Sequence, residues 1–454
     1  MHRPTRADFR SLLDLAVPLA AVQVGLMLMG VVDAAMLGRV SADALAAASV
    51  AGVWFFAAST IGMGCLTALD PVISQAFGAQ DEVGVARGVQ RGVLIAVIVT
   101  VPTMLVMLPI EAVLRFTKQP AAVVPLAGAY LRVILPSILP YFAFMMIREV
   151  LQSLGSLRTL LVIIGLANLL NVVLNWALIF GHLGAPALGV TGAALATTIS
   201  RWAMLAMTVV ATWRFLKPYV VPWRPESWAL APLGRMFAIG LPIGFQILLE
   251  YGVFGGVGLL MGQIGSPAVA GHQVALNMAA ITFMVPFGIG TAASVLVGRA
   301  VGGGRPDEAR RLTSAALVVG VAFMTATATI FRAFPEALAR AYSPDPAVLG
   351  VAAGLVPLAG LFQVFDGIQV VAMGVLRGIG DTRIPVLVNL AGYYLVGLPI
   401  SLWLGFELGW GPRGLWWGLV AGLVVVALAL VGRVRLKFRR NLDRLTIDRP
   451  EHSG

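Results

Sequence analysis

The 454-residue chain has little charge: 12% of its residues are Asp, Glu, Lys or Arg, and 59% are hydrophobic. A water-soluble domain is about 25% charged and about 45–50% apolar. A mean hydropathy of +0.90 leaves more apolar surface than a water-facing fold of this length can bury. The composition therefore excludes a soluble enzyme, a disordered chain and a disulfide-rich secreted domain, and it predicts an integral membrane protein.

Cysteine and histidine, which supply most metal and thiol chemistry, are nearly missing. Cys65 is the only cysteine, which excludes an internal disulfide and a cysteine-based metal site, and the four histidines form no HExxH motif. The phosphate-binding motif GxxxxGKS/T is also missing, so ATP does not drive the protein internally. We therefore expect that the protein is not an enzyme and has no cofactor. Its energy source is expected to be an ion gradient or the substrate's own gradient.

Apolar runs long enough to cross a bilayer follow one another along the chain. A hydrocarbon core of about 30 Å needs roughly 20 helical residues. The predicted spans are residues 12–38, 46–78, 88–114, 126–152, 160–183, 188–213, 234–262, 268–300, 311–334, 351–377, 385–408 and 413–435. The sequence thus predicts an all-α polytopic membrane protein with twelve transmembrane helices.

The basic residues predict the orientation of these helices. With a cytoplasmic N-terminus, 24 of the 32 Lys and Arg residues fall on the cytoplasmic side and six on the other side, while Arg132 and Arg201 fall within spans. Such an excess is the positive-inside signal. We expect both termini in the cytoplasm and the protein in the inner (plasma) membrane. Because the net charge of +11 lies in connections and tails, it indicates topology and no nucleic-acid partner.

The two halves of the chain repeat one another. The matching pairs, all 224 residues apart, are Pro18 and Pro242, Gly38 and Gly262, Ala44 and Ala268, Ala46 and Ala270, and Val50 and Val274. Six spans is an even number, so both halves start on the same side and form parallel-repeat six-helix bundles around a cleft suited to alternating access. The predicted parts are an N-terminal lobe at 1–213, a cytoplasmic linker at 214–233, a C-terminal lobe at 234–435 and a basic cytoplasmic tail at 436–454.

Acidic side chains within spans are the strongest candidates for function, because a carboxylate at membrane depth is costly unless it is paired, protonated or hydrated. The four candidates are Asp33, Asp70, Glu250 and Asp366. Glu111 and Glu149 lie near the predicted ends of spans, where we expect them to be solvated.

Glu250 and Asp366 both lie near the middle of their spans, and no Lys or Arg of the same half lies at that depth. Such a pair can share a bound monovalent cation, or at least one of the two can hold a proton. Either arrangement makes the charge of the site depend on the bound ion. The alternative is a protonated carboxyl group that only joins two helices by a hydrogen bond.

Asp33 is within reach of Asn171 and Asn175, which are four residues apart and share one helix face. The three side chains can ligate a cation or hold a proton; alternatively, the asparagines only pack helices together. Asp70 directly precedes Pro71, where a helical hydrogen bond is missing, so capping of that kink and a functional role are both open.

The sequence resembles the multidrug and toxic compound extrusion (MATE) transporters, and among them the NorM-like branch, from about residue 10 to about residue 435. The segments that carry the resemblance are GVVDAAMLGRVS (30–41), LLNVVLNWALIFG (169–181), LLEYGVF (248–254), VAGHQVALNMAAITFMVPFGIGTAASVLVGRAVG (269–302) and FDGIQVVAMGVLRGIGDTR (365–383). The resemblance implies two six-helix lobes that form a V-shaped central cleft. It also implies a secondary active multidrug efflux antiporter that exchanges lipophilic or cationic organic compounds for Na+ or H+.

The resemblance also implies roles for individual residues. Glu250 and Asp366 match the acidic pair that binds the coupling cation, which is a metal site if the ion is Na+. Asp33, with Asn171 beside it, matches the N-terminal-lobe aspartate of proton or sodium coupling.

The remaining matches concern the substrate. Gln273 and Asp345 match positions that hold cationic drugs, and the organic cation is expected to be drawn to Asp33, Glu250 and Asp366 as well.

Three positions depart from the family pattern. Phe362 stands where a tyrosine is expected one turn before Asp366, and Asn175 stands where related branches have an aspartate. Both departures bear on which ion is bound. Asp70 stands where an uncharged residue is expected and can add a proton site.

A lipid-linked saccharide flippase of a related fold is the alternative function. Such a protein is expected to line its cleft with Arg or Lys to hold a pyrophosphate, whereas the candidates here are acidic. The expected partners are drug-like organic cations and membrane lipid, and the duplicated lobes indicate a functional monomer.

Overall fold

The computed structural model describes residues 3–440 and 442–448, and every regular element in that part of the chain is helical. Twelve helices among these residues are long and apolar enough to cross a membrane. The predicted all-α class and the predicted number of spans are therefore confirmed.

The elements of the first half are α1 (Arg6–Leu37), α2 (Ala42–Thr67), α3 (Leu69–Gly78), α4 (Glu82–Met107), α5 (Ile110–Phe116), α6 (Val123–Ile134), η1 (Leu135–Ser137), α7 (Ile138–Ser153), α8 (Arg158–Phe180) and α9 (Gly189–Val220). Those of the second half are η2 (Pro225–Trp228), α10 (Leu230–Ile264), α11 (Ser266–Gly302), α12 (Pro306–Ala333), α13 (Pro335–Arg340), α14 (Pro346–Gly378), α15 (Arg383–Asn389), η3 (Leu390–Gly397), α16 (Leu398–Leu402), η4 (Trp403–Glu407) and α17 (Gly411–Phe438). Both η3 and η4 are π-helical.

Polar residues and glycine set several helix ends. Ser41 begins α2, where its Oγ accepts a hydrogen bond of 3.0 Å from the Ala44 amide. Asp81 begins α4 in the same way and accepts a bond of 2.8 Å from the Gly84 amide. These side chains satisfy amides that lack a partner within the helix. Gly181 ends α8 in the left-handed conformation, with φ of +79°, which glycine adopts at little cost.

The chain forms two compact units, and neither is a contiguous segment. The C-terminal unit contains the chain up to Ala20, Ser74–Gln80 and Phe245–Thr446, and the N-terminal unit contains Ala21–Ile73, Asp81–Gly244 and the chain from Ile447. The long helices α1 and α10 each change unit, two residues after Pro18 and Pro242 respectively. These exchange points are 224 residues apart, which is the shift of the sequence repeat. The compact units thus differ from the contiguous lobes predicted at 1–213 and 234–435.

Helices extend into the segments predicted as linker and tail. Helix α9 continues to Val220 and α10 begins at Leu230, so the connection is shorter than the predicted 214–233. Helix α17 continues to Phe438. Of the predicted tail at 436–454, residue 441 and residues 449–454 lie outside the described part. Within the N-terminal unit, Asp448 pairs with buried Arg91 at 2.5 Å.

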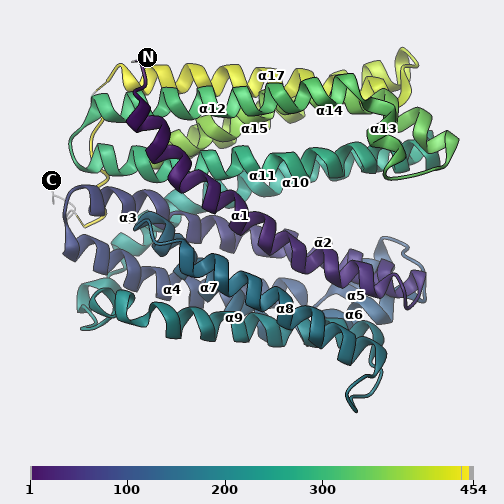
Figure 1. The fold of residues 1–454 in the computed structure, drawn as a ribbon, viewed down its shortest axis with the longest axis horizontal. Helices are drawn as coiled ribbons and strands as arrows, with labels where there is room; N and C mark the ends of the chain where they lie inside the picture. Colours follow the sequence, from purple (N-terminus) through teal and green to yellow (C-terminus); the bar gives the residue numbers. More distant parts are fainter. Residues whose placement is uncertain (1–2, 441, 449–454) are drawn as a thin grey trace. The chain divides into compact units, whose positions relative to one another are not determined.

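In the C-terminal unit, α14 packs against α11, α12 and α17 (Figure 1). Glycine allows the close approach of α14 to α11: a Cβ atom added to Gly374 would collide with the backbone of Gly290, and one added to Gly378 would collide with Ser294. Small residues at such contacts bring two helix backbones together, which is how membrane helices gain packing energy.

A substitution at this contact tests the packing. We expect Gly374→Ala to destabilise the protein by about 1–3 kcal/mol, because the added methyl group must displace the α11 backbone. Gly350→Ala on the same helix is the matched control, since a Cβ there meets no atom within 4 Å and alanine favours the helix. Thermal unfolding in detergent measures both. Equal unfolding temperatures for the two variants would contradict the proposed tight contact.

Candidate functional site

Glu250, in the middle of α10, is surrounded by side-chain amides. Its Oε1 atom accepts hydrogen bonds from Gln369 Nε2 at 2.6 Å and from Asn389 Nδ2 at 2.5 Å. Gln246, one helical turn before Glu250, donates a longer bond of 3.4 Å. The three donors come from α10, α14 and the end of α15, so the carboxylate joins three helices. Amide donors stabilise the charged form without supplying a positive charge.

Tyr393 holds one of these amides in place. Its hydroxyl donates to Gln369 Oε1 at 3.0 Å, which turns the NH2 group of that amide towards Glu250. Tyr393 is buried in η3, which begins directly after Asn389. Departures from α-helical geometry of this kind are frequent at functional sites.

Asp366 lies on α14, one turn before Gln369, and is half-buried. Gln369 of the same helix donates a hydrogen bond to Glu250, so the part of α14 that carries Asp366 packs beside the Glu250 carboxylate. Within residues 3–440 and 442–448, Asp366 has no hydrogen bond or ion pair, and Glu250 has no Lys, Arg or His partner. The structure thus brings the two predicted carboxylates together without a fixed cation.

The atoms around Glu250 fit a small hard cation. Na+ favours oxygen ligands, as other hard cations do. Besides the carboxylates, Asn389 offers its Oδ1 atom, which is fully buried and accepts no hydrogen bond from any described residue. A buried acceptor without a donor is costly, and a cation would relieve this cost. A proton shared between the carboxylates is the other arrangement that the site allows.

The substitution of Phe362 for the expected tyrosine leaves no hydroxyl at that position. Its ring packs edge-on against Phe254 and Trp416, with centroids 5.8 Å and 6.0 Å away. Nearby, His272 Nδ1 accepts a hydrogen bond of 3.1 Å from Trp416 Nε1, so this histidine joins two helices. Phe362 thus belongs to an apolar cluster and cannot be an oxygen ligand.

Asp33, in α1, forms a second polar site in the N-terminal unit. Its Oδ1 accepts from Asn175 Nδ2 at 2.5 Å and its Oδ2 from Thr197 Oγ1 at 2.7 Å, while Asn175 also donates to Asn171 Oδ1 at 3.1 Å. The structure therefore brings together Asp33, Asn171 and Asn175, as the sequence predicted. Asn175 Oδ1 and Asn171 Nδ2 are buried and have no partner among the described residues, which leaves both available to an ion or a ligand.

Two predicted substrate residues lie elsewhere. Gln273 is exposed on α11, and its Nε2 atom donates a hydrogen bond of 3.4 Å to Asn277 Oδ1. Asp345 is exposed and begins α14, where it accepts a hydrogen bond of 2.9 Å from the Ala347 amide. Along this helix, 21 residues separate Asp345 from Asp366, or roughly 32 Å at about 1.5 Å per residue. The structure thus does not bring Asp345 to the paired carboxylates, because it caps the far end of their helix.

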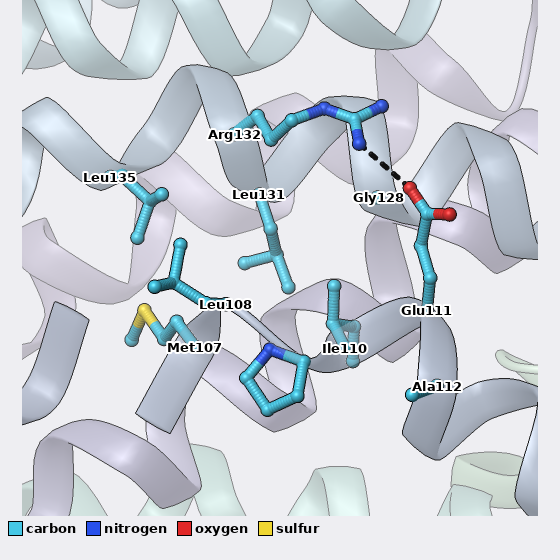
Figure 2. A pocket seen from close by; sticks show the side chains of 10 residues that line it. Met107, Leu108, Ile110, Glu111, Ala112, Gly128, Leu131, Arg132 and Leu135 are labelled. Atoms are coloured by element: carbon cyan, nitrogen blue, oxygen red, sulfur yellow. Dashed lines mark hydrogen bonds and ion pairs between the residues drawn. The ribbon is translucent and has the colours of Figure 1, made fainter. Parts of the chain in front are cut away.

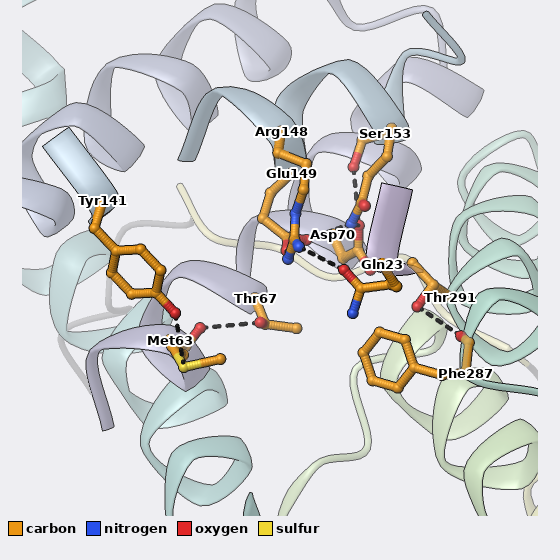
Figure 3. A network of polar contacts seen from close by, with 11 residues as sticks. Gln23, Met63, Thr67, Asp70, Tyr141, Arg148, Glu149, Ser153, Phe287 and Thr291 are labelled. Carbon is orange, nitrogen blue, oxygen red and sulfur yellow. Dashed lines mark hydrogen bonds and ion pairs between the residues drawn. The ribbon is translucent and has the colours of Figure 1, made fainter. Parts of the chain in front are cut away.

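Asp70 belongs to a third polar cluster, in the N-terminal unit (Figure 3). Its Oδ1 accepts from Gln152 Nε2 at 2.7 Å and from Ser153 Oγ at 3.2 Å. The Gln152 amide also donates to Glu149, which pairs with Arg148 at 2.8 Å. The sequence predicted Glu149 to be solvated, which is wrong: it is 2% exposed, because α7 continues past it and is buried there by its neighbours.

A cavity of about 330 Å³ lies where α4, α5 and α6 meet in the N-terminal unit (Figure 2). Its wall is largely apolar and includes Leu108 and Leu131. Arg132 Nη1 pairs with Glu111 Oε1 at 2.8 Å beside it. None of the predicted coupling residues lines this cavity.

Sequence reasoning missed the neutral partners of the carboxylates. Gln246 and Gln369 stand four residues before Glu250 and three residues after Asp366, so helical spacing would have indicated both. Asn389 and Thr197 lie on other helices, and no spacing rule connects them to their carboxylates.

Comparisons with known proteins agree with this architecture. The MatE family model matches residues 18–177 and again residues 242–403, so the second match begins 224 residues after the first, the shift of the internal repeat. Multidrug resistance protein NorM of Burkholderia vietnamiensis is 37% identical over 432 residues, covering 93% of each chain. A probable multidrug resistance protein NorM of Rhodopseudomonas palustris is 38% identical over 434 residues, covering 94% of this chain and 92% of the relative.

Solved structures share the fold. The crystal structure of the eukaryotic MATE transporter AtDTX14 is similar with a TM-score of 0.87 and 24% identity, over 95% of this chain and 96% of that chain. An outward-facing multidrug resistance MATE family transporter gives a TM-score of 0.86 at 20% identity, over 96% and 99% of the two chains. The resemblance drawn from the sequence motifs is confirmed. With family-model matches in both halves and NorM relatives over nearly its whole length, this chain belongs to the MatE family.

Proposed function

We propose that the chain is a secondary active multidrug efflux antiporter that exports lipophilic or cationic organic compounds in exchange for Na+ or H+. The names of its NorM relatives support the substrate class. The observation that carries the proposal is the pair Glu250 and Asp366, two carboxylates at membrane depth without a cationic side chain beside them in the described part of the chain. Transport of this kind needs no chemical step and no cofactor.

Exchange follows from competition for the same negative charge. An organic cation that enters from the cytoplasm or the inner leaflet is attracted to the carboxylates, and Na+ or H+ later takes its place. A ligand that bound every conformation equally could not drive the cycle, so the two cations must favour different states. Alternation between states open to opposite sides of the membrane then gives net export.

Asp33 is proposed as a second coupling position. Asn171, Asn175 and Thr197 surround it with neutral polar groups that suit a carboxylate whether it holds an ion or a proton. Gln273 remains a proposed substrate contact because its amide is exposed.

The flippase alternative receives less support. A pyrophosphate needs several basic side chains, whereas the carboxylates of Glu250 and Asp366 would repel it. We therefore retain the efflux function.

Charge-neutralising variants test the carboxylate pair. We expect Glu250→Gln and Asp366→Asn each to lower ethidium efflux at least about tenfold, since about 1.4 kcal/mol of lost attraction corresponds to a factor of ten. Each variant keeps the size of the side chain, removes the charge and replaces one acceptor oxygen by an NH2 group. Efflux is measured in proteoliposomes with imposed Na+ or proton gradients.

Glu336→Gln is the matched control, because Glu336 is exposed in the short helix α13 and is expected to leave efflux unchanged. Normal efflux by both membrane variants at equal protein levels would refute the coupling role.

We further propose that the protein acts as a monomer in the inner (plasma) membrane with both termini in the cytoplasm, as the excess of basic residues on one side indicates. Because Cys65 is the only cysteine and is buried, Cys65→Ser gives a background suited to single-cysteine labelling.

In that background, a membrane-impermeant maleimide is expected to label Glu336→Cys in intact cells and to label Glu82→Cys only after the cells are opened. Both positions are exposed, so access depends on the side of the membrane alone. Labelling of Glu82→Cys in intact cells would contradict the proposed orientation.

A further inference from the structure

Arg201 is a cationic side chain inside a span that the coupling mechanism does not use. It lies on α9, twelve residues from the start of that helix, which is about 18 Å along the axis. The side chain contacts Phe55 of α2, Tyr141 of α7 and Ser137 of η1, so it points towards other helices of the N-terminal unit. A charged residue at this depth needs a partner or a function.

Two aromatic rings hold the guanidinium group. Its central carbon lies 4.3 Å from the centroid of the Phe55 ring and 4.9 Å from that of Tyr141. The rings meet edge-on, with centroids 5.4 Å apart, and Tyr141 Oη contacts Met63 Sδ at 3.5 Å. Cation–π contacts of this kind stabilise a positive charge without using its N–H groups.

Most hydrogen-bond donors of Arg201 have no protein acceptor. A guanidinium group carries five N–H donors. In the described part of the chain it donates one hydrogen bond, from Nη1 to Ser137 Oγ at 2.9 Å, so four donors remain. Asp33 interacts with Arg201 electrostatically, but both carboxylate oxygens of Asp33 accept hydrogen bonds from other residues, namely Asn175 and Thr197. The half-buried group is therefore oriented, charged and open to an acceptor.

We infer that Arg201, held by Phe55 and Tyr141, is an anion subsite that binds the carboxylate of amphoteric substrates; this inference rests on the proposed efflux function. A planar guanidinium binds a carboxylate through two parallel hydrogen bonds, and the Phe55 and Tyr141 rings hold that plane in one orientation. Thr197 lies one helical turn before Arg201, and its hydroxyl donates a hydrogen bond to Asp33 Oδ2. The N-terminal unit thus presents a negative and a positive group close together, as a zwitterion requires.

The simplest competing role for Arg201 is neutralisation of Asp33. That role depends on charge alone, so a lysine at position 201 would fulfil it as well as an arginine. The subsite, in contrast, selects for a carboxylate. Two substrates that differ only in that group, compared in a lysine variant that keeps the charge, therefore separate the two roles.

Tetramethylrhodamine, which carries a carboxylate, and its methyl ester, which does not, are such a pair. We expect Arg201→Met to weaken binding of the acid about tenfold or more and to change binding of the ester less than about twofold, because hydrogen bonds to a charged group are lost only for the acid. Arg201→Lys keeps the charge without the planar fork and is expected to weaken acid binding by less than Arg201→Met. Arg132→Met is the matched control, an exposed arginine of the same unit.

Fluorescence anisotropy with purified protein measures binding, and proteoliposome efflux measures transport of each dye. If Arg201→Met weakened binding of both dyes equally, or left binding of the acid unchanged, the proposed subsite would be refuted. If Arg201→Met fails to fold, Arg201→Lys decides alone: a loss confined to the acid supports the subsite, and an equal effect on both dyes refutes it.

The two proposals fail in different ways. Selective loss of acid binding without transport of either dye would support the subsite and refute the efflux function. Export of the ester by a wild-type protein that does not bind the acid would refute only the subsite.

Discussion

The function proposed for this protein depends on one constraint: no arginine or lysine of the described residues neutralises the neighbouring carboxylates Glu250 and Asp366. Glu250 is solvated by the amides of Gln369 and Asn389, which replace water but add no charge. Asp366, beside it, has no such support in the described residues. At membrane depth this arrangement is costly. In the proposed function, a mobile cation removes this cost, and the site responds to ions for that reason.

The buried carboxylates of the N-terminal unit have different partners. Asp33 is held by neutral donors and lies near Arg201, and Glu149 pairs directly with Arg148. Positive and negative side chains therefore occur together in this unit, whereas the paired carboxylates of the C-terminal unit have no such counterpart. Within a repeated fold, the two halves thus present different electrostatic environments. In the proposed function, both units therefore attract cations, through Glu250 and Asp366 in one and Asp33 in the other, and only the N-terminal unit adds a positive group that suits an amphoteric molecule.

Long apolar runs made the twelve spans predictable, because only helices of that length satisfy their backbone in lipid. Glu250 and Asp366 could be predicted as a pair from their positions near the middle of their predicted spans alone. Other features depend on packing between distant segments. Asn389 approaches Glu250 from another helix, and α1 and α10 change unit after Pro18 and Pro242. Burial of Glu149 was missed because the end of an apolar run does not show which neighbours cover it.

The most direct test of the central claim is equilibrium binding of radiolabelled tetraphenylphosphonium to the purified protein, titrated with NaCl at fixed pH and with acid at fixed Na+. One of the two ions is expected to displace the organic cation competitively, and neutralising both Glu250 and Asp366 is expected to abolish this displacement. Binding that is indifferent to both ions, or displacement that persists in the neutral double variant, would contradict this claim.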